Sequence, residues 1–161
     1  MSKITQLMRE ELPNMTYQKK LSYRPSQSDV VKLFKLLNEE IFNNKLPMPE
    51  IEVAARCRKY WGYCIGLEIL ELTTDKSNCK IKLMDKWFCK QWLITTLAHE
   101  MVHQYQWDID GVKRIKQGKD PIMSHGPSFY KHKKKLAKFG ISLKKAHGRK
   151  KWFKHQNFNK C

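Results

Sequence analysis

The chain has 161 residues, which suits a single domain with a reasonable hydrophobic core. Its 32 basic and 15 acidic residues give a formal net charge of +17, which is more than solubility requires and indicates a polyanionic partner. The sequence argues against a membrane-spanning or secreted protein, because no apolar run is long enough to cross a bilayer and residues 1–11 lack a secretory signal.

The spacing of apolar residues predicts an α+β fold. Residues 1–25 are mixed and polar, and we treat them as an N-terminal extension without an assignable element. Ser26 or Ser28 can cap a helix whose apolar residues recur at helical spacing and which ends at Asn43. Three strands of a small sheet follow, at 51–55, 62–72 and 79–84.

The second half of the chain is predicted to be mainly helical. A long helix covers about 86–106, an irregular segment runs from Trp107 to Ser124, and a last helix begins at Pro127 and ends near Lys138. Loops of more than about 12 to 15 residues without structure are uncommon unless they are functional or disordered. We therefore favour an irregular segment that borders a substrate cleft over a merely tolerated insertion.

The long helix carries a metal-binding pattern. His99 and His103 are four positions apart, so both imidazoles lie on one face and can reach a single ion. Glu100 lies further round the helix, near enough to act on a water molecule without coordinating the ion, which favours a catalytic base over a ligand. Trp92 and Thr96 share the ligand face and are expected to line the cleft. The simpler alternative is a core helix with two hydrogen-bonded histidines.

A catalytic zinc site needs a third protein ligand and one open position. His125 is the best candidate, because Gly126 lets the backbone bend after it and Pro127 suits the first turn of a helix. The competing candidates have simpler explanations as loop carboxylates or a solvated helix residue. They are Asp108, Asp110, Asp120 and His132.

These segments resemble the SprT-like metalloproteases, the family that includes Spartan. The resemblance rests on LAHEMVH at 97–103 and HGPSF at 125–129, and it extends to upstream segments at 38–43, 45–47 and 61–64. It implies a zincin-like core in which the small sheet packs on the ligand helix. It also implies zinc-dependent cleavage of proteins, often proteins attached to DNA. By motif position, the zinc ligands are His99, His103 and His125, and the catalytic residue is Glu100.

The cysteine pattern departs from that of many family members, which carry a four-cysteine zinc ribbon after the protease core. The five cysteines of this chain have no paired CxxC spacing, and after Cys89 there is one, Cys161. We therefore expect reduced thiols and no ribbon-mediated DNA contact. The chain is interpreted as a minimal catalytic core at 26–143 with a basic tail at 144–161.

The basic tail is the second strong signal, because residues 121–161 contain no Asp or Glu. Clustered lysines attract phosphates, and aromatic residues between them can stack on bases. A solvated tail without a partner is the simpler alternative, and an anionic membrane surface is disfavoured because apolar residues are sparse after Leu143. The candidate nucleic-acid contacts are Lys144, Lys145, Arg149, Lys150, Lys151, Trp152 and Lys154.

Two functional interpretations follow. The first is a monomeric, cytoplasmic or DNA-associated zinc endopeptidase that acts on DNA-bound or DNA-crosslinked proteins, without a membrane partner. The alternative is a non-catalytic nucleic-acid-binding module with a zinc site. Glu100 favours the enzyme, because a structural site has no use for a carboxylate between its histidines. A metal-dependent nuclease is a weaker third option, because nuclease metals prefer oxygen-rich sites.

Overall fold

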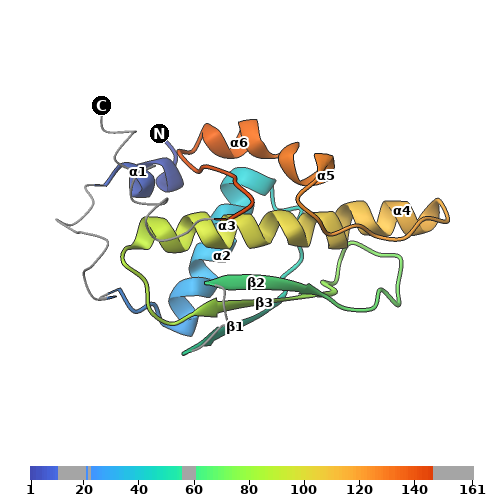
Figure 1. The fold of residues 1–161 in the computed structure, drawn as a ribbon, viewed down its shortest axis with the longest axis horizontal. Helices are drawn as coiled ribbons and strands as arrows, with labels where there is room; N and C mark the ends of the chain where they lie inside the picture. Colours follow the sequence, from blue (N-terminus) through green and yellow to red (C-terminus); the bar gives the residue numbers. More distant parts are fainter. Residues whose placement is uncertain (11–20, 22, 56–60, 147–161) are drawn as a thin grey trace.

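The computed structural model describes residues 1–10, 21, 23–55 and 61–146, and the fold is α+β, as predicted (Figure 1). Its sheet contains β1 (Glu50–Ala54), β2 (Gly62–Gly66) and β3 (Cys79–Met84) in the order β1-β3-β2. The central strand β3 is parallel to β1 and antiparallel to β2. Within the described residues, none of the helices has the length and apolar character that crossing a bilayer requires.

The helix α2 (Gln27–Phe42) follows the sequence prediction closely. Ser26 begins it with a capping box, in which its hydroxyl accepts from the Asp29 backbone N–H and its own N–H donates to the Asp29 carboxylate. The helix ends at Asn43, whose φ of 54° is left-handed. Between these ends, apolar residues such as Phe34 and Ile41 are buried in the core.

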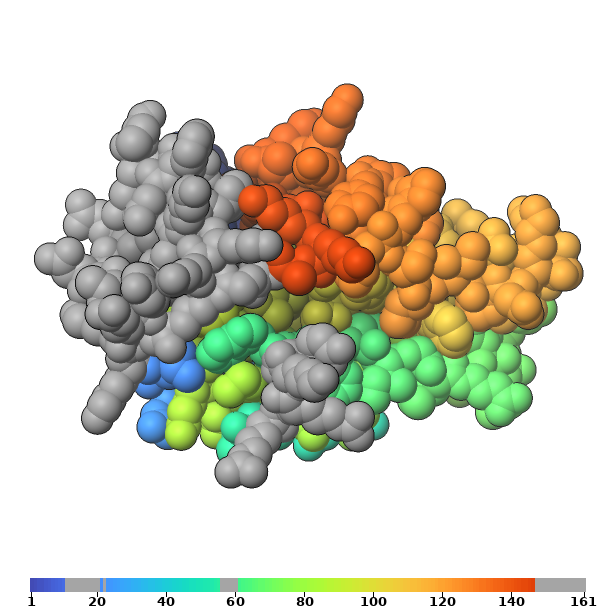
Figure 2. Space-filling view, viewed as in Figure 1, coloured from blue at the N-terminus to red at the C-terminus, as the bar shows by residue number. Residues whose placement is uncertain are grey.

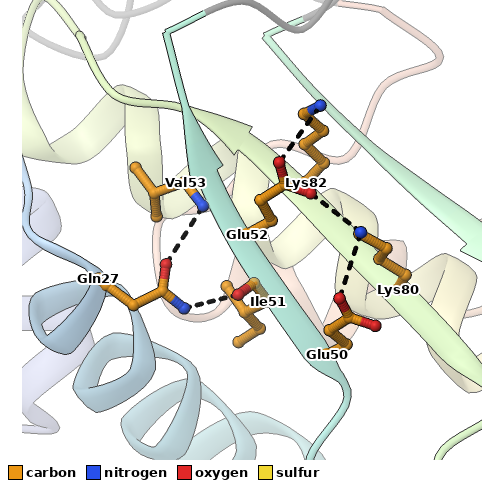
Figure 3. A network of polar contacts seen from close by, with 7 residues as sticks. All are labelled: Gln27, Glu50, Ile51, Glu52, Val53, Lys80 and Lys82. Carbon is orange, nitrogen blue, oxygen red and sulfur yellow. Dashed lines mark hydrogen bonds and ion pairs between the residues drawn. The ribbon is translucent and has the colours of Figure 1, made fainter.

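The two faces of the sheet have opposite chemistry. Ile51, Ile81 and Leu83 belong to the hydrophobic core together with residues of α2 and of α3 (Lys90–Gln104), the helix that carries the candidate ligands His99 and His103. Figure 3 shows the polar residues of β1 and β3, where Lys80 pairs with Glu50 and Glu52. This alternation of side chains is the period of two that predicted the strands.

The outer edge of β1 is covered by one side chain of α2. The amide of Gln27 donates to the carbonyl of Ile51 at 2.6 Å and accepts from the backbone N–H of Val53 at 3.2 Å (Figure 3). These bonds satisfy backbone groups that would otherwise be available to another strand. The other edge of the sheet, formed by β2, lies beside α3.

The helical rod that begins with α3 is longer than predicted. It continues without a break through a π-helix, η1 (Tyr105–Gly111), and then α4 (Val112–Lys116) (Figure 1). The prediction of an irregular segment from Trp107 to Ser124 is therefore wrong for residues 107–116, which are helical. Long-range contacts hold these turns, since the Trp107 indole packs against Gly66 and donates to the carbonyl of Leu67 at 2.8 Å.

Other elements also differ from the prediction, among them α3, which begins at Lys90 and not near residue 86. The strand β2 ends at Gly66, because the following apolar run does not pack as a strand and leaves Leu70 80% exposed. The last helix is divided into α5 (Pro127–Tyr130) and α6 (Lys133–Ala137). In the unassigned N-terminal segment, α1 (Lys3–Arg9) forms because the Glu40 carboxylate accepts from its first two backbone N–H groups, both at 2.9 Å. A local pattern does not reveal that contact.

Candidate metal centre

The ligand helix α3 is buried on nearly all sides, and β2 packs closely against it. Gly62 makes this approach possible, because a Cβ at this position would lie 2.7 Å from Leu83 and 3.2 Å from Thr96. His103 is buried, while His99, one turn earlier, is partly exposed. The helix thus presents both imidazoles beside the edge of the sheet.

The third histidine comes from the loop between α4 and α5. Its Nε2 lies 3.2 Å from Nε2 of His103 and 3.3 Å from Nε2 of His99, so His125 completes a cluster. Tetrahedral coordination with bonds of about 2.0–2.1 Å separates ligand nitrogens by roughly 3.3–3.4 Å. These two spacings fit a small tetrahedral ion such as zinc, and all three ligand atoms lie within 4.8 Å of one another. The assignment of the three residues as ligands stays a prediction.

The competing candidates have other surroundings. The ring of His132 lies 4.6 Å from that of Tyr105, and burial lowers its pKa to about 4. Asp110 pairs with Lys131 at 2.6 Å, and the carboxylate of Asp108 accepts from backbone and side-chain donors at the start of β3. Asp120 is exposed. Among the described residues, these side chains do not join the histidine cluster.

The surroundings of His103 and His125 favour neutral imidazoles, the form that binds a metal ion. Burial lowers the pKa of His103, and the nearby His125 lowers it further, although a hydrogen bond to Gln106 opposes the shift. Burial and then the charge of Lys145 lower the pKa of His125. Both rings are therefore easier to keep unprotonated than histidines in water.

The cluster lies in a cavity of about 600 Å³. Its walls come from β2 and the residue before it, from α3, from residues 123–125 and from residues 145–146. Figure 2 shows the end of the described chain (red) beside this region, with α3 visible between that segment and β2. The prediction that the segment before His125 borders a cleft is thus met by its last residues. Thr96 lines the cavity as expected.

Trp92 does not line the cavity, which corrects the sequence prediction. It is 1% exposed, stacks on Phe88 with ring centroids 5.0 Å apart, and contacts Trp61 at 4.2 Å. The helical wheel placed it on the ligand face, but the segments before β2 and α3 cover that position. Trp92 therefore belongs to the core.

Glu100 opens into the same cavity and is 6% exposed. Burial raises its pKa from 4.5 to about 8, and a hydrogen bond from the backbone N–H of Cys64 opposes this rise. A cation held by the histidines would favour the carboxylate and lower this pKa. Without an ion, the carboxyl group therefore keeps its proton more readily than a glutamate in water does.

The candidate nucleic-acid contacts are only partly described. Lys145 lies in the cavity wall, close enough to affect His125, and Lys144 precedes it as an exposed residue. The basic segment therefore starts at the rim of the candidate metal centre. The other contacts lie outside the described residues, namely Arg149, Lys150, Lys151, Trp152 and Lys154.

Sequence reasoning missed Gln106, whose side chain contacts both His103 and the segment around His125. One signal was available, because Gln106 follows His103 by three positions and thus shares its helix face. The role of Lys145 in the cavity wall gave no such signal, since it depends on how residues 141–146 return across the fold.

Comparison with known families agrees with this geometry. The sequence pattern of the SprT-like family matches residues 30–149, which is most of the chain. The chain belongs to the SprT-like family. SprT-like proteins are generally related to metalloproteases, and the matched range contains the three histidines and Glu100. Comparison with curated protein sequences finds no match.

Proposed function

We propose that this SprT-like protein is a zinc-dependent endopeptidase that acts on DNA-associated or DNA-crosslinked proteins. The proposal depends chiefly on one observation, the opening of the Glu100 carboxyl group and the three imidazoles into a single cavity. A site built only to hold an ion has no need of that carboxyl group. Family membership supports the same chemistry.

The residues of the cavity account for hydrolysis of a peptide bond. His99, His103 and His125 would hold zinc, which polarises a carbonyl group and acidifies water when it is bound. The Glu100 carboxylate accepts a proton from the attacking water and then donates it to the leaving nitrogen. The position of Glu100 in the same cavity as the histidines places both transfers beside the proposed ion.

A polypeptide substrate is supported by the strand beside the site. β2 is an edge strand, and the cavity is lined by Gly62, Tyr63 and Cys64 of this strand. Backbone groups at a sheet edge can pair with an extended chain, which gives affinity for a peptide without a sequence requirement. The cavity then receives the bond to be cleaved.

The catalytic assignment is tested with Glu100→Gln, which preserves size but removes the base. Zinc content should persist, while cleavage of a DNA-bound protein should fall by at least about a hundredfold, the lower range for loss of a general base. Reactions with and without DNA and a chelator separate the contributions of the nucleic acid and the metal. A protein that binds zinc and DNA but never cleaves would favour the alternative, a nucleic-acid-binding module.

The DNA assignment is supported by charge. Lys133, Lys134 and Lys138 are exposed on or beside α6, and the sequence continues with basic residues beyond the cavity wall. We propose that the basic tail at 144–161, together with the lysines of α6, brings the protease to DNA. The Lys-rich composition suits phosphate attraction more than base reading.

This proposal is tested with a triple Lys→Gln variant at 150, 151 and 154, which leaves Lys144, Lys145 and the metal centre in place. The slope of log affinity against log salt should flatten by roughly 0.9 per lost duplex contact. The matched control carries Lys→Gln at 113, 116 and 119, which has the same charge change on α4 and the residues after it. If the two triple variants flattened the salt dependence equally, the tail would contribute to DNA binding only through the net charge of the protein.

A further inference from the structure

One buried amide joins the two segments that carry the candidate ligands. Gln106 lies in η1 and is 0% exposed. Its side-chain nitrogen donates to the carbonyl of Ser124 and to the hydroxyl of Ser128, each at 2.8 Å. Its oxygen lies 2.8 Å from Nδ1 of His103. Both N–H groups of the amide are therefore bonded to the segment around His125, and its oxygen faces His103.

The Ser124 carbonyl determines which way the amide faces. A carbonyl oxygen can only accept, so the NH₂ group of Gln106 must point toward it. The amide oxygen consequently points toward His103, where it needs a donor, and Nδ1 of that ring must carry the proton. This tautomer leaves a lone pair on Nε2, the nitrogen that lies 3.2 Å from Nε2 of His125. The ring is thus presented in the form that a metal ion requires.

The nitrogen side of the amide acts on the other ligand. Ser124 directly precedes His125, and Ser128 lies in the first turn of α5, so the two bonds hold the chain on both sides of the turn at His125. The loop before this turn is otherwise a long connection from α4. The amide therefore fixes a short stretch of it against the helical rod.

We propose that Gln106 is the positioning residue of the metal centre, fixing the tautomer and orientation of His103 and the place of His125 through one side chain. The inference rests on the proposed metal centre and adds how this chain organises it. It concerns ion binding, so it is tested without reference to proteolysis.

The experiment compares Gln106→Met with Gln104→Met in the full-length protein. Gln104 is an ideal control because it is also a fully buried glutamine of the same helical rod, but its amide bonds to Pro47 and Asp108 instead of to the ligands. Zinc affinity is measured by competition with a chromophoric chelator. Gln106→Met should bind zinc about 10- to 100-fold more weakly, the usual cost of losing a partner of a ligating histidine. Gln104→Met should bind within about threefold of the parent protein.

A conservative variant tests the tautomer separately. Gln106→Glu keeps an acceptor for the His103 Nδ1–H but loses the two donors that hold the segment around His125, so it should recover part of the affinity lost by Gln106→Met. The visible spectrum of the cobalt-substituted proteins reports the geometry of the ion and should change in Gln106→Met but not in Gln104→Met.

Three outcomes would overturn the inference. They are parental affinity in Gln106→Met, equal losses in the two Met variants, and no recovery in Gln106→Glu. If the parent protein itself bound no zinc, the metal centre would fail together with the inference. If the parent bound zinc but cleaved nothing, the proposed protease would fail and the positioning role would stand.

Discussion

Gln104 and Gln106 are two residues apart and equally buried, and the amide nitrogen of each donates hydrogen bonds, yet these bonds lead to different groups. The Gln104 network reaches Asp108, the carbonyl of Pro47, and Ser77 and Asn78 before β3. The Gln106 network ends at the candidate ligands. The first joins a helix to a sheet, and the second joins a histidine to a loop. Burial and hydrogen bonding alone therefore do not identify a functional side chain, whereas the group at the far end of the network does.

The largest effect on stability is expected at the centre of the Gln104 network. Asp108→Ala removes the acceptor for Ser77, Asn78 and Gln104 and leaves these donors without it, so we expect a loss of about 3 kcal/mol in the free energy of unfolding. Denaturant titration measures this loss. Asp110→Ala is the control, because it removes a partly exposed pair with Lys131 and should cost less than about 1 kcal/mol. Similar values for both would contradict the contrast between the networks.

Zinc should distinguish the two glutamines through stability as well as affinity. An ion at one hundred times its dissociation constant stabilises the folded state by about 2.7 kcal/mol, and a tenfold weaker site loses about half of that gain. Thermal unfolding with and without zinc should therefore show a full gain in Gln104→Met, despite its lower starting stability, and a reduced gain in Gln106→Met. A full gain in both variants would show that the Gln106 network has no special relation to the ion.

A pH-dependent effect is expected at His132, which belongs to neither network. Its folded pKa of about 4 is below the unfolded value of 6.5, because burial and then the charges of Lys135 and Lys131 disfavour the protonated ring. The unfolded chain thus binds this proton first as the pH falls. The stability present above pH 6.5 is lost between pH 6.5 and 4, by about 2 kcal/mol after allowance for partial solvent screening.

The variant His132→Phe should remove this loss, because a phenyl ring can pack against Phe42 and Tyr105 without accepting a proton. Urea titrations at several pH values between 7 and 4, with chelator present, compare the two proteins. Parallel losses in parent and variant would assign the acid sensitivity to other groups.

The smallest effect is expected in the third polar network, on the open face of the sheet. Glu52→Gln breaks exposed ion pairs with Lys80 and Lys82, which water and salt already weaken. Unfolding curves of parent and variant should differ little at low salt and coincide at high salt. A persistent difference would mean that this network is less accessible to solvent than its exposure indicates.

The sequence was sufficient for features whose causes are local. The cap of α2, which the sequence narrowed to Ser26 or Ser28, the end of α2 at Asn43, the alternation in β3 and the two histidines one turn apart all follow from neighbouring residues. The start of a helix at Pro127 after Gly126 was also predicted from the sequence, and the structure places His125 beside His99 and His103.

The remaining features depend on contacts between distant segments. The rod continues through η1 because Asp108 and Trp107 bind groups about 30 or 40 positions away, which outweighs the glycine at 111. Trp92 does not line the cavity as predicted, because Trp61, from another segment, packs over its ring. Gln106 lies between these cases, since its position on the ligand face was visible but its partners in the loop were not.

The Gln27 side chain makes the two edges of the sheet unequal, because it bonds backbone groups at the β1 edge. By occupying the carbonyl of Ile51 and the N–H of Val53, it removes the pairing groups that an incoming strand would need at the β1 edge. Within the described residues, the opposite edge of the sheet is β2, which borders the cavity and whose Cys64 N–H donates to Glu100. Under the proposed function, a peptide that pairs with this sheet would therefore do so at the β2 edge, beside Glu100.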